Sequence, residues 1–259
     1  MPVALITGAA RGIGLQTAQQ FLDEGWSVAL LDIDGETQAA AAEAVGAPER
    51  VLALTCDVAI DVEVARAFEA VAGRFGKLDA LVNNAGTAVF KPIVETRAEE
   101  WRRVLDVNLT GPFLCTQAAL PLMTDGGAIV NIASISGQRA STLRVAYGTS
   151  KAAIMHLTKQ MAVEFAGQGV RVNCVAPGPV DTAMAKAVHS KEIRADYHDA
   201  IPLGRYGLEA EIADAILFLC SARASYVTGQ VLSVDGGFEA TGIGLPTLRR
   251  AVEENGGTT

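Results

Sequence analysis

Short runs of apolar, often β-branched residues alternate along the chain with longer helical patterns, and this alternation restricts the fold more than any other feature. The runs are too short for helices and lack polar alternation, which is typical of strands buried on both faces of a parallel sheet. They span residues 3–7, 28–31, 51–55, 78–82, 128–132, 170–175 and 231–234. We therefore predict an α/β fold, a doubly wound parallel sheet of about seven strands with helices on both faces.

Size and composition favour one domain and exclude several functional classes. The chain has 259 residues and a formal net charge of -8, so it offers no clustered basic surface for nucleic acid. Its four cysteines show no CxxC spacing, which predicts reduced thiols and a cytoplasmic location. We expect neither a signal peptide nor a membrane span, because the first apolar run stops at Gly8 and no later run is long enough. The predicted domain covers residues 1–238, and residues 239–259 form a tail that we expect to reach a neighbouring subunit.

A glycine-rich segment, TGAARGIG, follows the first predicted strand and opens the first predicted helix. Glycines at positions 8, 12 and 14 allow a sharp turn and close approach of a pyrophosphate, whose charge the helix N-terminus favours. A purely structural turn is the alternative. We predict a Rossmann-like dinucleotide site that includes Gly8, Arg11, Gly12, Ile13 and Gly14.

Two charged residues give opposite indications about the dinucleotide. Asp32 closes the second predicted strand, where a carboxylate accepts hydrogen bonds from the ribose hydroxyls of NAD but repels the 2'-phosphate of NADP. Arg11, in contrast, could attract that phosphate. We predict NAD, with NADP the weaker alternative, and include Ile33 beside Asp32 in the site.

Polar residues after the third and fourth predicted strands lie at the same sheet edge. Asp57 and Val58 follow the third strand, and Asn84, Ala85 and Gly86 follow the fourth. Ligands of such sheets bind beyond the carboxyl ends of the strands, so we expect both segments to contact the adenine or support neighbouring loops. Helix capping or a turn is the alternative role.

Tyr147 and Lys151 lie four residues apart in a strongly helical segment, so both project from one face. Ser134 ends the fifth predicted strand 13 residues before Tyr147, and Asn108 lies in a helix upstream. Together with TGAARGIG, NNAG, PGPVDT and VDGG, this set resembles the short-chain dehydrogenase/reductase family over roughly residues 3–238.

The resemblance implies an oxidoreductase with Asn108, Ser134, Tyr147 and Lys151 as catalytic residues. Tyrosine would be the general acid/base, serine would orient the substrate oxygen, lysine would also bond the nicotinamide ribose, and asparagine would hold a water of the proton relay. Free tyrosine titrates near 10, so we expect the Lys151 ammonium to lower the pKa of Tyr147. The resemblance also implies nicotinamide contacts from Pro177, Val180 and Thr182, although Thr182 could simply cap a helix.

The stretch from about residue 178 to 208 contains no predicted strand, and we interpret it as a substrate-facing lid. Specificity residues are expected in it, notably His189 and Tyr197, and also at Ser136, Gln138 and Val145. Arg139 and Arg144 could meet an anionic substrate or remain solvated. The scattered histidines predict no catalytic metal.

These features predict an NAD-dependent oxidoreductase that interconverts a secondary alcohol (a polyol, sugar, hydroxy acid or cyclic alcohol) and its ketone. The resemblance implies a homotetramer. An NADP-dependent 3-oxoacyl carrier-protein reductase is the alternative enzyme. A non-catalytic cofactor-sensing protein is a further alternative, disfavoured because Tyr147 and Lys151 are both present.

Overall fold

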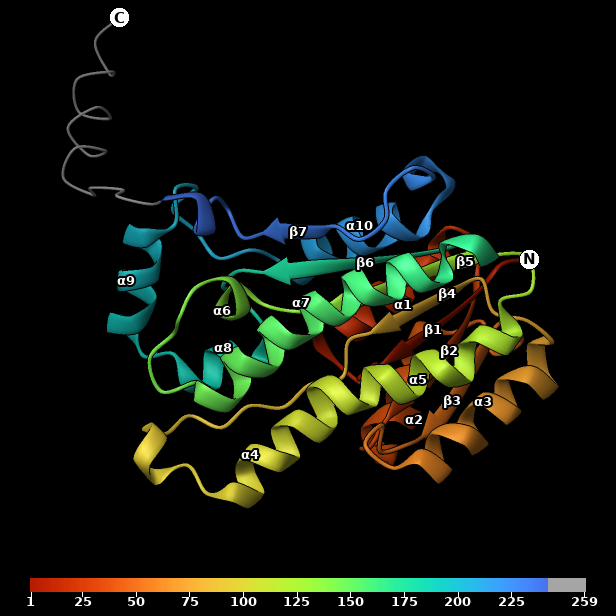
Figure 1. Ribbon diagram of the computed structural model, residues 1–259, viewed down its shortest axis with the longest axis horizontal. Coiled ribbons are helices and arrows are strands. Elements are labelled where there is room, and N and C mark those ends of the chain that lie inside the picture. Colours follow the sequence, from red (N-terminus) through yellow and green to blue (C-terminus); the bar gives the residue numbers. More distant parts are fainter. Residues whose placement is uncertain (242–259) are drawn as a thin grey trace, which may run out of the picture.

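A computed structural model describes residues 1–241, apart from the side chain of Met184. Seven parallel strands form one sheet in the order β3-β2-β1-β4-β5-β6-β7, which confirms the predicted doubly wound α/β architecture (Figure 1). The strand bounds are β1 Val3–Thr7, β2 Ser27–Asp32, β3 Val51–Thr55, β4 Ala80–Asn83, β5 Gly127–Ile132, β6 Val170–Pro177 and β7 Val231–Val234.

Helices cover both faces of this sheet. One face packs against α3, α5 and α7, and the other against α1, α2 and α10. The bounds are α1 Gly12–Asp23, α2 Gly35–Val45, α3 Asp61–Phe75, α4 Ala98–Leu105, α5 Gly111–Ala119, α6 Ile135–Gln138, α7 Val145–Phe165, α8 Ala183–Val188, α9 Lys191–Ala200 and α10 Glu209–Cys220. Short 3₁₀ turns lie at Ile93–Glu95, Leu120–Leu122, Ala166–Gln168, Ala222–Ala224 and Glu239–Thr241. No helix in residues 1–241 is both long and apolar enough to cross a membrane.

Two predictions about the strands need correction. The central strands are almost entirely buried, as expected, but β3 and β7 consist of partly buried and exposed residues because they are the two edges of the sheet. The fourth strand begins at Ala80 rather than at Leu78, whose main-chain N–H bonds to Leu122 O at 2.9 Å instead.

Polar side chains inside the sheet connect it to α7. Asn83 on β4 donates to Asn131 Oδ1 on β5 at 2.8 Å, and Asn131 Nδ2 donates to Thr158 Oγ1 on α7 at 2.9 Å. All three residues are buried, where an unmade hydrogen bond would be costly. These hydrogen bonds therefore fix α7 against β4 and β5.

The carboxyl ends of the strands lie at one edge of the sheet, together with α6, α8 and α9 (Figure 1). The predicted lid, residues 178–208, contains α8 and α9, and an isolated bridge between Val180 and Gly207 closes its base. The predicted tail, residues 239–259, lies outside the described residues from position 242 onward.

Candidate active site

A cavity of about 750 Å³ opens at the carboxyl ends of the strands. Its lining combines residues from the glycine-rich turn, the ends of β2 to β6, the start of α7 and the lid. Every residue predicted to be catalytic or to bind the cofactor lines it except Gly14 and Asn108. The sequence motifs thus converge on one cavity.

The turn after β1 has the shape that a pyrophosphate requires. Gly8 and Gly12 have φ values of 65° and 62°, and a Cβ on Gly8 would lie 2.8 Å from Ala85 Cα. Asn84 Nδ2 donates to the carbonyls of Thr7 and Gly8 at 2.9 and 3.0 Å and holds the turn in place. No described side chain caps the start of α1, so its N–H groups can bind an anion. These residues fit the phosphates of a dinucleotide.

Gly14 has a different role from the one predicted. It does not line the cavity, and a Cβ at this position would lie 2.2 Å from Gly8 O. Glycine is needed here because α1 packs directly on the main chain of the turn.

Two carboxylates surround the end of β2. Asp32 accepts hydrogen bonds from the N–H groups of Ala10 and Asp34 at 3.0 and 3.1 Å, which aims its carboxylate at the cavity rim. Asp34 caps α2 through Thr37, and this capping lowers the pKa of Asp34. Arg11 Nη2 lies 3.8 Å from Asp34 Oδ2. The cation that could attract NADP therefore already faces a carboxylate.

Asp57 links the end of β3 to the helix pair α4–α5. Its carboxylate accepts from Ala59 N at 3.0 Å and pairs with Arg103 Nη2 at 2.8 Å. Arg103 itself lines the cavity, although no sequence motif indicated it. Asp57 and Val58 therefore form part of the cavity wall, and their contact with adenine stays a prediction.

Close packing of α6 on α7 brings the catalytic candidates together. A Cβ on Gly137 would lie 2.5 Å from Lys151 C, and one on Gly148 would lie 2.9 Å from Ser136 O. Because both positions are glycine, Ser134 at the start of α6 comes within hydrogen-bond range of the Tyr147 hydroxyl.

The environment of Tyr147 differs from the prediction. Burial raises the pKa of its phenol, while the Ser134 hydrogen bond and the Arg144 guanidinium oppose this increase. The expected lowering by Lys151 is not found, since Lys151 Nζ donates to Ile132 O at 2.7 Å and lies 5.7 Å from the centre of the phenol ring. Serine and Arg144, rather than lysine, are the protein groups that favour the phenolate here.

Lys151 is buried, and burial lowers the pKa of its ammonium to about 8. The folded protein therefore loses this proton at lower pH than the unfolded chain, so folding becomes more favourable as the pH rises from about 8 toward the ordinary lysine value.

Relative to Lys151→Met, the wild-type free energy of unfolding is expected to increase by about 2 kcal/mol between about pH 7 and about pH 10. Urea denaturation at several pH values measures this difference. Lys159→Met, at an exposed position of α7, is the control and should show no such trend. If the difference in free energy of unfolding between the wild type and Lys151→Met did not change with pH, the lowered pKa of Lys151 would be contradicted.

Asn108 lies in a π-helical turn, Asp106–Thr110, between α4 and α5. Its amide donates to Thr87 O and Ser150 Oγ at 2.9 and 3.0 Å and accepts from Thr87 N–H at 2.8 Å. A Cβ on Gly86 would lie 3.5 Å from Asn108 Oδ1 and 3.6 Å from Lys151 Nζ, so Asn108 lies next to two residues that line the cavity. The side chain thus fixes the loop after β4, and the water-holding role stays a prediction.

Residues after β6 form the floor near the lid. Pro177, Val180 and Thr182 all line the cavity. Thr182 also caps α8, since its Oγ1 accepts from Ala185 N at 3.1 Å. The capping role and the predicted nicotinamide contact are therefore compatible.

The residues expected to determine specificity divide into two groups. Arg144, His189 and Tyr197 line the cavity, as does Phe90, which no sequence motif indicated. The remaining residues do not line it: Ser136, Gln138, Val145 and Arg139. Their side chains are used elsewhere in at least two cases, because Gln138 bonds Ser233 Oγ at 2.9 Å and Arg139 bonds Phe238 O at 2.8 Å.

Comparisons with known proteins agree with this geometry. A family model described as enoyl-(acyl carrier protein) reductase matches residues 8–239. The chain is 41% identical to a 3-oxoacyl-[acyl-carrier-protein] reductase, FabG, of Thermotoga maritima, with 91% of this chain and 96% of the relative covered. It is 40% identical to cis-4-hydroxycyclohexanecarboxylate dehydrogenase of Sinomonas cyclohexanicum, with 92% and 96% covered.

Among solved structures, a short-chain dehydrogenase/reductase described as glucose/ribitol dehydrogenase from Brucella melitensis superposes with a TM-score of 0.88. The two chains are 34% identical, and the match covers 92% of this chain and 96% of that one. With the glycine-rich turn, the serine, tyrosine and lysine around one cavity, and these relatives over nearly the full length, the chain belongs to the short-chain dehydrogenase/reductase family.

Proposed function

We propose that this oxidoreductase oxidises a secondary alcohol to its ketone with NAD as the hydride acceptor. The observation that carries the proposal is the Ser134–Tyr147 hydrogen bond beside buried Lys151, in the cavity that also holds the glycine-rich turn. A cofactor-sensing protein without turnover would not need Ser134, Tyr147 and Lys151 together in this cavity.

The protein groups account for orientation and proton transfer. When bound, the nicotinamide supplies the hydride acceptor. Ser134 and Tyr147 present two hydroxyls to one substrate oxygen, and Tyr147 takes the alcohol proton as general base. Because burial opposes ionisation of the phenol, nearby positive charge is needed in the reacting complex, and the Arg144 guanidinium supplies it.

The end of β2 supports NAD over NADP. A 2'-phosphate at the Asp32 carboxylate would meet like charge, and Asp34 adds a second carboxylate beside Arg11. Like charges brought together in a binding site cost several kcal/mol.

A second candidate is a 3-oxoacyl carrier-protein reductase that uses NADP. The 41% identity to FabG of Thermotoga maritima is the observation in its favour. The carboxylates at the end of β2 count against its cofactor, and the hydroxycyclohexanecarboxylate dehydrogenase is similar to almost the same degree.

One activity panel separates the two candidates. Purified protein is given NAD or NADP with polyols, sugars, hydroxy acids that include 4-hydroxycyclohexanecarboxylate, and cyclic alcohols, and reduced cofactor is followed by absorbance. Reduction of acetoacetyl-CoA with NADH or NADPH is measured in parallel. Alcohol oxidation with NAD supports the proposal, whereas fastest turnover of the thioester with NADPH would replace it with the second candidate.

The implied homotetramer is also a proposal. Large apolar side chains are exposed on two helices of one face, with Phe113 on α5 44% exposed and Val163 on α7 79% exposed. Burial of these side chains against other subunits would remove apolar surface from water. Light scattering coupled to size-exclusion chromatography measures the assembly mass, and a monomer would contradict the proposal.

A further inference from the structure

The cationic side chains that line the cavity differ in what balances their charge. Within residues 1–241 the Lys and Arg residues of the lining are Arg11, Arg103, Lys151 and Arg144. The first two face aspartates at the dinucleotide end, and Lys151 bonds a main-chain carbonyl. No carboxylate in the described part of the chain forms an ion pair with Arg144, which lies at the opposite end with the lid residues His189 and Tyr197.

Arg144 is held beside the catalytic tyrosine. It precedes α7 as the N-cap residue, three positions before Tyr147. Its guanidinium lies 5.1 Å from the centre of the Phe90 ring, and Nη1 is 3.4 Å from Ser136 Oγ. A guanidinium has five N–H donors, so most of them stay available to a ligand in the cavity.

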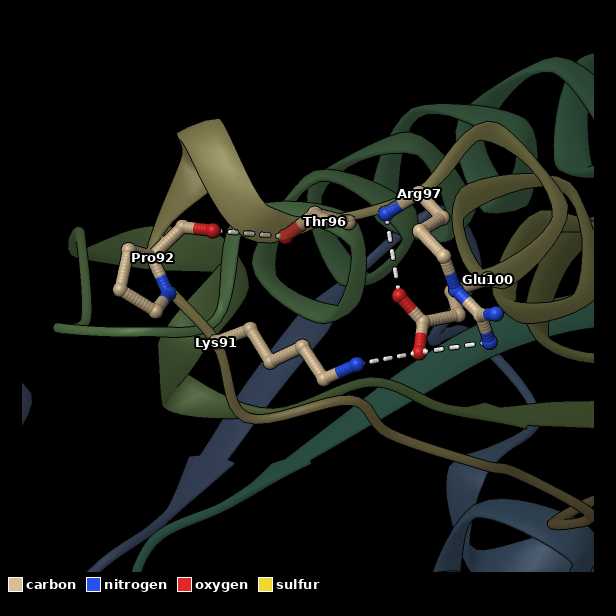
Figure 2. Close-up of polar contacts among 5 residues, drawn as sticks. All are labelled: Lys91, Pro92, Thr96, Arg97 and Glu100. Carbon is tan, nitrogen blue, oxygen red and sulfur yellow. Dashed lines mark hydrogen bonds and ion pairs between the residues drawn. The ribbon is translucent and has the colours of Figure 1, made fainter.

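The loop after β4 supports this position. Lys91 N–H donates to Leu143 O at 3.0 Å, and Lys91 forms an isolated bridge with Arg144. The Lys91 ammonium bonds Glu100 Oε1 at 2.6 Å, and Glu100 also accepts from Arg97 N–H at 3.0 Å (Figure 2). Leu143 has a φ of 61°, a conformation that a leucine keeps only when its surroundings enforce it. Glu100 and Lys91 are therefore positioning residues for Arg144 and Phe90.

We propose that Arg144 binds an anionic group of the substrate, so that the alcohol oxidised here is a hydroxy acid rather than a neutral polyol or cyclic alcohol. This inference rests on the proposed function and names its substrate class. A carboxylate matches the fork of N–H donors on the guanidinium and would supply the charge partner that the described residues lack. Phe90 covers the guanidinium with an apolar face, which reduces its contact with water and strengthens an ion pair.

Arg144 has a competing role, because its charge also favours the phenolate of Tyr147. A residue that served only this purpose would affect every alcohol equally. Substrate binding by Arg144 would instead distinguish an acid from its neutral ester.

The test compares matched pairs of substrates: 4-hydroxycyclohexanecarboxylate and 3-hydroxybutyrate, each with its methyl ester, using NAD and the full chain. Wild-type kcat/KM is expected to be about 10- to 100-fold higher for an acid than for its ester. Arg144→Gln should remove this preference, mainly by raising the KM of the acid, and Arg144→Lys should restore part of it. Arg139→Gln is the matched control, since Arg139 lies outside the cavity and bonds main-chain carbonyls, and it should leave the acid-to-ester ratio unchanged.

Two results would overturn the inference while leaving the proposed function in place. One is turnover in which esters or neutral alcohols are as good as the acids. The other is an equal loss of activity for acid and ester in Arg144→Gln, which would assign the residue to the tyrosine alone. No oxidation of any alcohol in the earlier panel would instead contradict the proposed function itself.

Discussion

Replacing Tyr147 with phenylalanine is expected to lower kcat about 10³-fold or more, because the variant keeps the ring but loses the hydroxyl that we propose takes the alcohol proton. NAD affinity should change little, since the glycine-rich turn and Asp32 are untouched. Steady-state kinetics with the best alcohol of the panel gives kcat, and fluorescence titration with NADH gives the cofactor affinity.

The same substitution elsewhere on the chain controls for the loss of a hydroxyl. Tyr226 is fully exposed to solvent and does not line the cavity, so Tyr226→Phe should keep wild-type activity. Circular dichroism and thermal unfolding establish that both variants are folded. A folded Tyr147→Phe that retains most of its turnover would show that another group transfers the proton.

Removing both carboxylates at the end of β2 is expected to reverse the cofactor preference. Serine at positions 32 and 34 takes away the charges that repel a 2'-phosphate, leaves Arg11 without its partner, and keeps a capping hydroxyl for α2. The ratio of kcat/KM for NAD to that for NADP should fall about 10³-fold, the size expected for relief of several kcal/mol of like-charge repulsion.

A neighbouring acid tests whether overall charge explains such a change. Glu36 lies in the first turn of α2 but does not line the cavity, and Glu36→Gln should leave the cofactor ratio close to that of the wild type. If the wild-type protein preferred NADP, the role proposed for Asp32 would be contradicted.

Much of the fold and site could be predicted because the relevant signals are local. An apolar run such as residues 3–7 identifies a buried strand by itself, and its bounds match β1. Ligand sites of doubly wound sheets lie at the carboxyl ends of strands, so Gly8, Asp32 and Asn84 could be assigned to one site without knowing any distance.

What could not be predicted depends on contacts between distant segments. Arg139 and Arg144 are five positions apart and equally charged, yet only the second lines the cavity. The difference arises because Phe238, about a hundred residues later, supplies the carbonyl that binds Arg139. The raised pKa of Tyr147 likewise follows from how deeply α7 is buried, which its own sequence does not specify.

The π-helical turn between α4 and α5 limits how the length of this segment can vary. The N–H of Gly111 bonds to Asp106 O, five residues back, so the turn accommodates one residue more than a regular helix would. Deleting a residue from it would rotate α4 relative to α5 by about 100°, the angle per residue of an α-helix. Arg103 would then point away from Asp57 and Glu100 away from Lys91, so a one-residue deletion here would break both an ion pair of the cavity wall and the one that holds the loop after β4.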